Sequence, residues 1–265
     1  MKNYPLKIQK NFDEDPRIID EIERILQIRR GFIFQLAKHE PIVFIISGGL
    51  DSSLILDKIL KELQCTIFPV YVERGAKAEA FEKESVIFFT NYYQEKYPGL
   101  LKDLMLCKTD IPPKDVKQFI PAERLMTIGH PMRNAILQSI GVQYGVGLSY
   151  ANQINIHTIF TATSPDDTFP HSSLLALRCL TLAACIDNGD WEWQVTSPLV
   201  ETYLWGKISK KDMVLYATEN KLPLEKTRTC TSGSSIACGI CPECLCRLNA
   251  FKMAGIKDPI NYVQR

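Results

Sequence analysis

A buried strand that runs directly into a glycine loop and a helix constrains this chain more than any other feature. Residues 42–46 read IVFII, an apolar run too short for a helix and typical of a strand buried on both faces of a parallel sheet. The loop SGGLDSS follows at 47–53. Two glycines at such a turn let the backbone approach an anion, and the start of the next helix adds partial positive charge. The sequence therefore predicts a phosphate-binding loop.

Strands and helices alternate along the rest of the chain, which predicts an α/β fold with an open, doubly wound, mostly parallel sheet. We expect an N-terminal helical lead-in over residues 1–40, an α/β domain over 41–225 and a small cysteine-rich, zinc-binding appendage over 226–265. Further strands are expected at 65–72, 103–107, 155–162 and 193–195, and helices at 17–38 (kinked at Gly31), from Asp51, at 77–97, from Asn134, at 172–186 and at 210–220.

Charge and hydropathy exclude several classes of protein. The chain has 31 Lys and Arg against 30 Asp and Glu, a formal net charge of +1, so no overall field would hold it on nucleic acid or on an anionic membrane. No apolar run approaches the roughly 20 residues of a membrane-spanning helix. The first 17 residues lack the apolar segment of a signal peptide. We expect a cytoplasmic protein with neither a membrane nor a nucleic acid as partner.

The loop residues have expected roles in binding a nucleotide. Serine hydroxyls donate to phosphate oxygens, and Asp51 either caps the helix or holds Mg²⁺. The loop lacks the GK[ST] ending of a Walker loop, which argues against a kinase or motor ATPase because no lysine is aimed at a γ-phosphate. The expected ATP-binding residues are Ser47, Gly48, Gly49, Leu50, Asp51, Ser52 and Ser53.

Five of the nine cysteines fall within 17 residues. Cys230, Cys238, Cys241 and Cys244 form the pattern C-x7-C-x2-C-x2-C, which can place four thiolates round one metal centre, and Cys246 is left over. Structural zinc is the preferred interpretation and an iron-sulfur cluster is the alternative, whereas disulfides are disfavoured in a reducing cytosol. The remaining cysteines are expected to be small core residues: Cys65, Cys107, Cys179 and Cys185.

Three segments of the chain resemble known families. The loop SGGLDSS resembles the SGGxDS motif of the N-type ATP pyrophosphatases (PP-loop, adenine nucleotide alpha hydrolase-like), whose loop grips the β and γ phosphates as leaving pyrophosphate. The stretch from Cys241 onward resembles the end of the 7-cyano-7-deazaguanine synthase (QueC) family, and HPMRN at 130–134 resembles that family's P-G-R-N segment. The matching residues of the C-terminal stretch are Arg247, Ala250, Phe251, Ala254, Gly255, Asp258 and Pro259.

The resemblance implies an ATP-dependent carbon-nitrogen ligase of queuosine biosynthesis. Such enzymes use ATP to activate the carboxylate of 7-carboxy-7-deazaguanine, add ammonia to form an amide, and dehydrate the amide to a nitrile with more ATP. The implied cofactors are Mg²⁺ and a structural Zn²⁺, with ATP as a substrate, and we expect a homodimer. The implied catalytic residues are Asp51, Ser52 and Arg133, and the implied substrate-binding residues are Arg133, Asn134, Asp167 and His171.

The chain departs from the family at the rim where substrate is expected. YVERG at 71–75 replaces a tyrosine-glycine-glutamine turn of the family. The segment at 164–178 keeps Asp167, but the residues from His171 to Ser173 replace those of the family. These changes leave the amine donor and the nitrile step open. The chain is either an ordinary family member whose rim has changed or one that resembles the diverged QueC-like proteins of anti-phage operons and joins the base to an amine larger than ammonia, such as one on a protein. His171 is either a base or a helix cap.

Two other functions stay open from the sequence. One is a PP-loop enzyme that adenylates a tRNA base for sulfur transfer, and the other is a module that senses ATP without turnover. Release of pyrophosphate separates the sensor from both enzymes.

Overall fold

The sheet has five parallel strands in the order β3-β2-β1-β4-β5. The computed structural model of the 265-residue chain describes residues 15–167 and 169–263. Because chain order reverses between β1 and β4, the loops that follow these two strands diverge and leave a crevice. The predicted parallel sheet is confirmed, with strands β1 (Pro41–Ile45), β2 (Thr66–Glu73), β3 (Met105–Lys108), β4 (Thr158–Phe160) and β5 (Gln194–Thr196).

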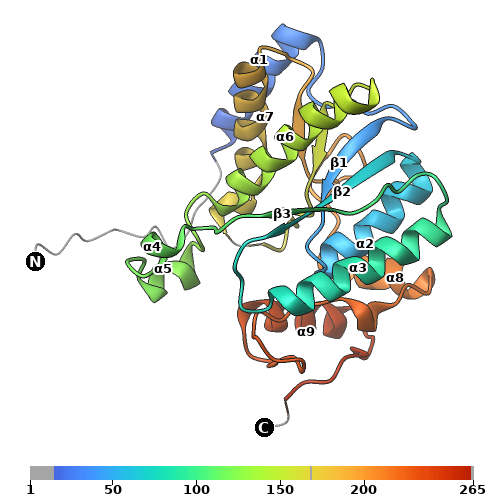
Figure 1. The fold of residues 1–265 in the computed structure, drawn as a ribbon, viewed down its shortest axis with the longest axis vertical. Coiled ribbons are helices and arrows are strands. Elements are labelled where there is room, and N and C mark those ends of the chain that lie inside the picture. The colour runs from blue at the N-terminus through green and yellow to red at the C-terminus, as the bar shows by residue number, and fades with distance from the viewer. Residues whose placement is uncertain (1–14, 168, 264–265) are drawn as a thin grey trace, which may run out of the picture.

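Helices cover both faces of the sheet, so the fold is doubly wound (Figure 1). Side chains of β1 alternate between two cores: Ile42 and Phe44 pack with one set of helices, and Val43 and Ile45 with the other. The first set is α2 (Leu50–Lys58, continued by a π-helical turn, Ile59–Leu63), α3 (Glu79–Lys96), α8 (Lys210–Glu219) and α9 (Pro242–Ala254), and the second is α1 (Pro16–Arg30), α6 (Arg133–Asn152) and α7 (Leu174–Asn188).

Short helices occupy the connections. They are α4 (Lys114–Lys117), α5 (Ala122–Thr127) and two 3₁₀ turns, Pro170–Ser172 and Leu224–Lys226. In Figure 1, α4 and α5 project from the body of the molecule. Within the described residues, no helix is both long and apolar enough to cross a membrane.

The first helix is shorter than the sequence predicts. The prediction of a helix over 17–38, kinked at Gly31, is wrong because α1 ends at Arg30. Gly31 has φ +82° and donates its N–H to the Gln27 carbonyl, which closes the helix with a left-handed glycine. The chain then runs without helical structure to β1, and Phe34 stacks on Phe160 of β4 at 6.3 Å between ring centroids.

The C-terminal segment is packed against the α/β body. Ala250 and Phe251 of α9 belong to the same core as Leu54 of α2 and Met213 of α8. The predicted boundary at 225/226 stays a prediction.

The four cysteines that precede the cysteine-rich segment differ in burial. Cys65 and Cys185 are buried and Cys107 is partly buried, but Cys179 is exposed. The expectation that Cys179 is a core residue is wrong because it lies on the outward face of α7, between the buried Arg178 and Thr181.

Candidate active site and metal centre

A cleft of about 410 Å³ opens at the carboxyl ends of β1 and β4. The glycine loop after β1 forms one wall, and the start of α6 forms another with residues 161–163, 166, 167 and 169 after β4. Lys210 at the start of α8 and several residues of the C-terminal segment complete it. The volume lies within the range that small-molecule sites occupy.

Gly48 fixes the glycine loop through close backbone contact. Its φ is +72°, and a Cβ there would lie 2.6 Å from the Glu82 carbonyl oxygen of α3. Its own carbonyl accepts a hydrogen bond from the Arg228 N–H at 2.7 Å and lies 2.8 Å from Ser85 Oγ. No other residue type fits this position without shifting the loop.

The structure brings most, but not all, of the predicted loop residues to the cleft. Ser52 Oγ lies 2.9 Å from Ser47 Oγ, and both residues line the cleft together with Gly49, Leu50 and Asp51. Gly48 does not line it. Ser53 is fully buried outside the cleft, so its hydroxyl is not delivered to a cleft ligand as the sequence suggested.

The start of α2 faces the cleft without a side-chain cap. Gly49 is the N-cap and has no side chain to cap the helix, while its own N–H donates to Ser47 Oγ at 3.4 Å. The suggestion that Asp51 caps this helix is therefore wrong, because Asp51 lies inside the first turn. Uncapped N–H groups at a helix start favour an anion.

Asp51 and Asp167 share the ammonium of Lys210. The Lys210 Nζ lies 2.9 Å from Asp51 Oδ2 and 2.8 Å from Asp167 Oδ1. Burial raises the pKa of Asp51 to about 6, although Lys210 opposes this. Burial would lower the pKa of Lys210, but the two carboxylates outweigh it and raise that pKa. Asp51 Oδ1 is buried without a hydrogen-bond partner among the described residues, which suits a metal ligand.

Sequence reasoning missed Lys210. The chain has no lysine in the loop itself, and a lysine from the start of α8, far along the sequence, reaches the cleft instead. The capping box of Ser209 and Asp212 marks the start of that helix and was the available signal, although it does not reveal that the helix begins beside the loop.

Arg133 is a partly buried cation at the rim. Its Nε donates to Asn134 Oδ1 at 3.2 Å, and no carboxylate of the described residues lies within 4.0 Å of its guanidinium. Burial, with help from the Arg74 charge, lowers the pKa of Arg133. Arg133, Asn134 and Asp167 line the cleft as predicted, whereas His171 does not line it. The predicted direct contact of His171 with substrate is therefore not supported by its position.

Other cleft residues come from separate segments that no motif connects. Arg74 pairs with Glu82 through two hydrogen bonds of 2.9 and 3.0 Å. Polar residues from four further stretches also line the cleft: Gln138, Thr161, Thr163, Thr229, Thr231 and Glu243.

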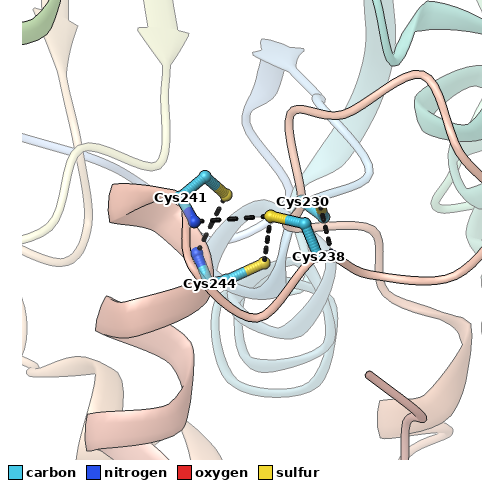
Figure 2. A group of neighbouring side chains, drawn as sticks. All are labelled: Cys230, Cys238, Cys241 and Cys244. Carbon is cyan, nitrogen blue, oxygen red and sulfur yellow. Dashed lines mark hydrogen bonds between the residues drawn. The ribbon is translucent and has the colours of Figure 1, made fainter. Parts of the chain in front are cut away.

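The predicted four-cysteine cluster is assembled. The sulfur atoms of Cys230, Cys238, Cys241 and Cys244 lie within 4.8 Å of one another, and those of Cys238 and Cys244 are 4.0 Å apart (Figure 2). Tetrahedral Zn–S bonds of about 2.3 Å place sulfurs about 3.8 Å apart. Cys246 is exposed and lines the cleft instead of joining the cluster.

Backbone amides point at these sulfurs, as expected around bound thiolates. The Cys238, Cys241 and Cys244 N–H groups donate to the sulfurs of Cys230, Cys238 and Cys241 at 3.3, 3.4 and 3.4 Å. Burial raises the pKa of Cys230, but hydrogen bonds from Cys238 and Ser232 outweigh it and lower that pKa to about 6. The four residues therefore fit a metal centre.

Arg228 joins the cysteine loop to the glycine loop. Its backbone N–H donates to Gly48, as described above, while its guanidinium donates to carbonyls between Cys230 and Cys238. The accepting residues are Cys230, Ser232, Ser234 and Ser235, at 2.7 to 3.1 Å. The guanidinium thus organises the cysteine loop.

Comparison with known proteins places the chain in a family. The model of the queuosine biosynthesis protein QueC matches residues 41–255. The 7-cyano-7-deazaguanine synthase of Acetivibrio thermocellus is 28% identical over 236 residues, 84% of this chain and 98% of that protein. The 7-cyano-7-deazaguanine synthase of Chloroherpeton thalassium is 24% identical over 83% of this chain and 96% of that protein. The 7-cyano-7-deazaguanine synthase 2 of Desulfitobacterium hafniense is 27% identical over 84% of this chain and 93% of that protein.

A solved structure is also similar, at a lower level. The U34-tRNA thiolase NcsA from Methanococcus maripaludis, which contains a [4Fe-4S] cluster, aligns with a TM-score of 0.39 and 13% identity over 90% of this chain and 73% of that one. This score carries no argument about the metal of the present protein. The match of the QueC model to most of the chain is sufficient by itself: the chain belongs to the QueC family, a family of ATP-dependent ligases.

Proposed function

We propose that this protein cleaves ATP between the α and β phosphates and adenylates the carboxylate of 7-carboxy-7-deazaguanine. One observation carries the proposal: the uncapped start of α2 opens into the same cleft as the Arg133 guanidinium, which no carboxylate of the described residues contacts. The first is suited to phosphate and the second to a carboxylate or an acyl adenylate.

Each part of the cleft has a role in the first step. The glycine loop, with Ser47 and Ser52, binds the β and γ phosphates, and Lys210 neutralises charge beside it. Mg²⁺, which neutralises phosphate charge when bound, would be held by Asp51. Arg133 orients the carboxylate so that one of its oxygens attacks the α-phosphorus and pyrophosphate leaves.

The second step transfers the acyl group to an amine. The amine nitrogen attacks the acyl carbon, AMP leaves with one of the former carboxylate oxygens, and the amine loses a proton to water. Ammonia gives the primary amide, and a second ATP then supports its dehydration to the nitrile. The substrate rim differs from the family's at Glu73 to Gly75 and at His171 to Ser173. Because orientation supplies much of the rate of such an attack, these changes support an acceptor larger than ammonia, such as an amine on a protein.

The four-cysteine cluster has a structural role in this proposal. The four thiolates would hold Zn²⁺ as a structural ion without leaving a coordination position open, and this would stabilise the segment in which Arg228 contacts the glycine loop.

The test is a product assay with ATP, Mg²⁺, 7-carboxy-7-deazaguanine and ammonium. We expect pyrophosphate and AMP in amounts that depend on the carboxylate, and an acyl product identified by mass. ADP as the main nucleotide product would contradict the proposal, and so would nucleotide binding without turnover. The mass of the product distinguishes amide from nitrile.

A further inference from the structure

His171 lies behind Arg133 and is held in place on several sides. Its ring stacks on Phe169 with 5.3 Å between centroids and 8° between planes. Gly129 approaches the ring so closely that a Cβ there would lie 2.9 Å from His171 Cε1, and its φ is +81°. Contacts on these sides hold the ring in one orientation, which it needs in order to position the neighbouring Arg133 side chain.

Arg133 makes two hydrogen bonds at the rim. One goes from Nε to Asn134, and the other from Nη2 to His171 Nε2 at 3.4 Å. Asn134 also donates to the His171 carbonyl at 3.2 Å, so the three residues form one network. No described residue accepts a hydrogen bond from Arg133 Nη1, which leaves that group for a ligand.

The hydrogen bond between Arg133 Nη2 and His171 Nε2 determines the tautomer of the histidine. A guanidinium has no acceptor, so His171 Nε2 must accept, and a neutral ring then carries its proton on Nδ1. The Ile128 backbone acts on the ring in the sense that raises the pKa of His171, which is the effect of a nearby carbonyl oxygen. Both neighbours agree with the Nδ1–H form.

The charges around the ring favour the same form. Arg133 and Arg124 face it as cations and Asp167 as a carboxylate. Burial, reinforced by Arg133, lowers the pKa of His171 to about 4. A base poised for work near neutral pH has a pKa nearer 7.

We propose that His171 is a positioning residue, not a base: its neutral Nε2 accepts a hydrogen bond from Arg133 and holds the guanidinium toward the carboxylate of the substrate. The proposal rests on the proposed function. It explains why His171 is enclosed by Phe169 and Gly129 yet does not line the cleft.

Two substitutions separate hydrogen bonding from packing. His171→Phe keeps a ring for Phe169 to stack on but removes the acceptor, whereas His171→Gln keeps an acceptor. We expect His171→Phe to raise the KM for the carboxylate about 10- to 100-fold, the usual effect of losing an orienting partner, with the KM for ATP unchanged. His171→Gln should recover most of the loss. Equal losses in both variants, or no loss in His171→Phe, would overturn the proposal.

The tautomer gives a second readout that needs no turnover. In the ¹⁵N-histidine-labelled full-length protein, the His171 signals are those missing from His171→Gln. We expect a protonated Nδ1, an unprotonated Nε2 and no titration between pH 7 and 5.5. A protonated Nε2 would overturn the proposal even if the enzyme is active. If wild-type protein shows no turnover that depends on the carboxylate, the proposed function fails while this spectrum still decides the role of His171.

Discussion

The two ends of the cleft are held by different kinds of contact. At the end where we propose that ATP binds, which is called the ATP end below, Gly48 is fixed mainly through its backbone. It fits against the Glu82 carbonyl, and its own carbonyl accepts from the Arg228 N–H and the Ser85 hydroxyl. At the rim, Arg133 is held by the side chains of Asn134 and His171. Backbone contacts tie the loop to the whole fold, whereas side chains can be exchanged one at a time. By this account, residues of the proposed substrate rim can change while the proposed ATP loop is kept.

Removal of the metal is expected to have the largest effect, and to act on the ATP end. Structural zinc contributes about 10 kcal/mol or more to the folding of small zinc-dependent segments. Cys244→Ser should therefore lose the metal, lower the melting temperature and weaken ATP binding through the loop that Arg228 connects. Metal content, melting temperature and ATP affinity are the measurements.

Cys246→Ser is the matched control, because Cys246 is two residues away and outside the cluster. It should keep about one zinc per chain. If Cys246→Ser loses the metal while Cys230→Ser keeps it, the ligand assignment is wrong. A brown protein that contains iron would show that the four cysteines hold an iron-sulfur cluster and not zinc.

Lys210→Ala is expected to abolish most ATP turnover. The substitution leaves Asp51 and Asp167 close together without the ammonium that both contact. Loss of one electrostatic group at a transition state typically costs about 10² to 10³ in rate. Pyrophosphate release is the measurement, and Lys207→Ala, at an exposed lysine nearby, is the control. Wild-type rates in Lys210→Ala would remove this residue from the mechanism.

Two glycine substitutions compare a position where an added Cβ would clash with its surroundings and a position where it would meet no neighbouring atom. Gly48→Ala forces a side chain into left-handed backbone, which costs about 1–2 kcal/mol, and also against the Glu82 carbonyl. Gly147→Ala, in α6 with nothing within 4 Å of the added Cβ, should instead stabilise the protein by about 0.5–1 kcal/mol. Denaturant unfolding measures both. Equal effects would contradict the claim that the loop is held by backbone contact.

The smallest effect expected is a pH dependence confined to the ATP end. Asp51 must be ionised to hold Mg²⁺, so kcat/KM for ATP should fall as the pH drops through about 6, and Asp51→Asn should lack this limb.

The raised pKa of Asp51 means that the folded state binds this proton more readily than the unfolded chain does. The Asp51 group alone therefore stabilises the fold as the pH falls from about 6 toward 4. His171, with a pKa lowered to about 4, stays neutral in the folded protein near pH 6 and should add no limb to kcat/KM. The unfolded chain takes up this proton first, so the His171 group alone destabilises the fold as the pH falls from about 6.5 toward 4. If the fall of kcat/KM near pH 6 persists in Asp51→Asn, a group other than Asp51 is responsible for it.

The sequence predicts features that are local in the chain. The strand at 42–46, the loop after it and the four clustered cysteines follow from short-range patterns, and all three are present. Gly31 illustrates the limit, because glycine in a helical pattern predicts either a kink or an end, and only the backbone angle decides.

Residues that reach the cleft from distant segments could not be predicted in this way. Lys210 and Arg74 depend on how α8 and β2 are placed relative to the loop, which packing decides. The position of His171 behind the cleft depends on its stacking with Phe169 and on the close approach of Gly129. The resemblance to the family and the place of His171 at the expected rim suggested a substrate contact.

The most direct test of the central claim follows the carboxylate oxygen. The wild-type enzyme is supplied with ATP, Mg²⁺, ammonium and 7-carboxy-7-deazaguanine labelled with ¹⁸O in both carboxylate oxygens, and the AMP is weighed. If the carboxylate attacks the α-phosphorus and the amine then displaces AMP, each AMP carries one labelled oxygen and pyrophosphate appears in equal amount. Unlabelled AMP, or ADP with phosphate as the products, would contradict the account.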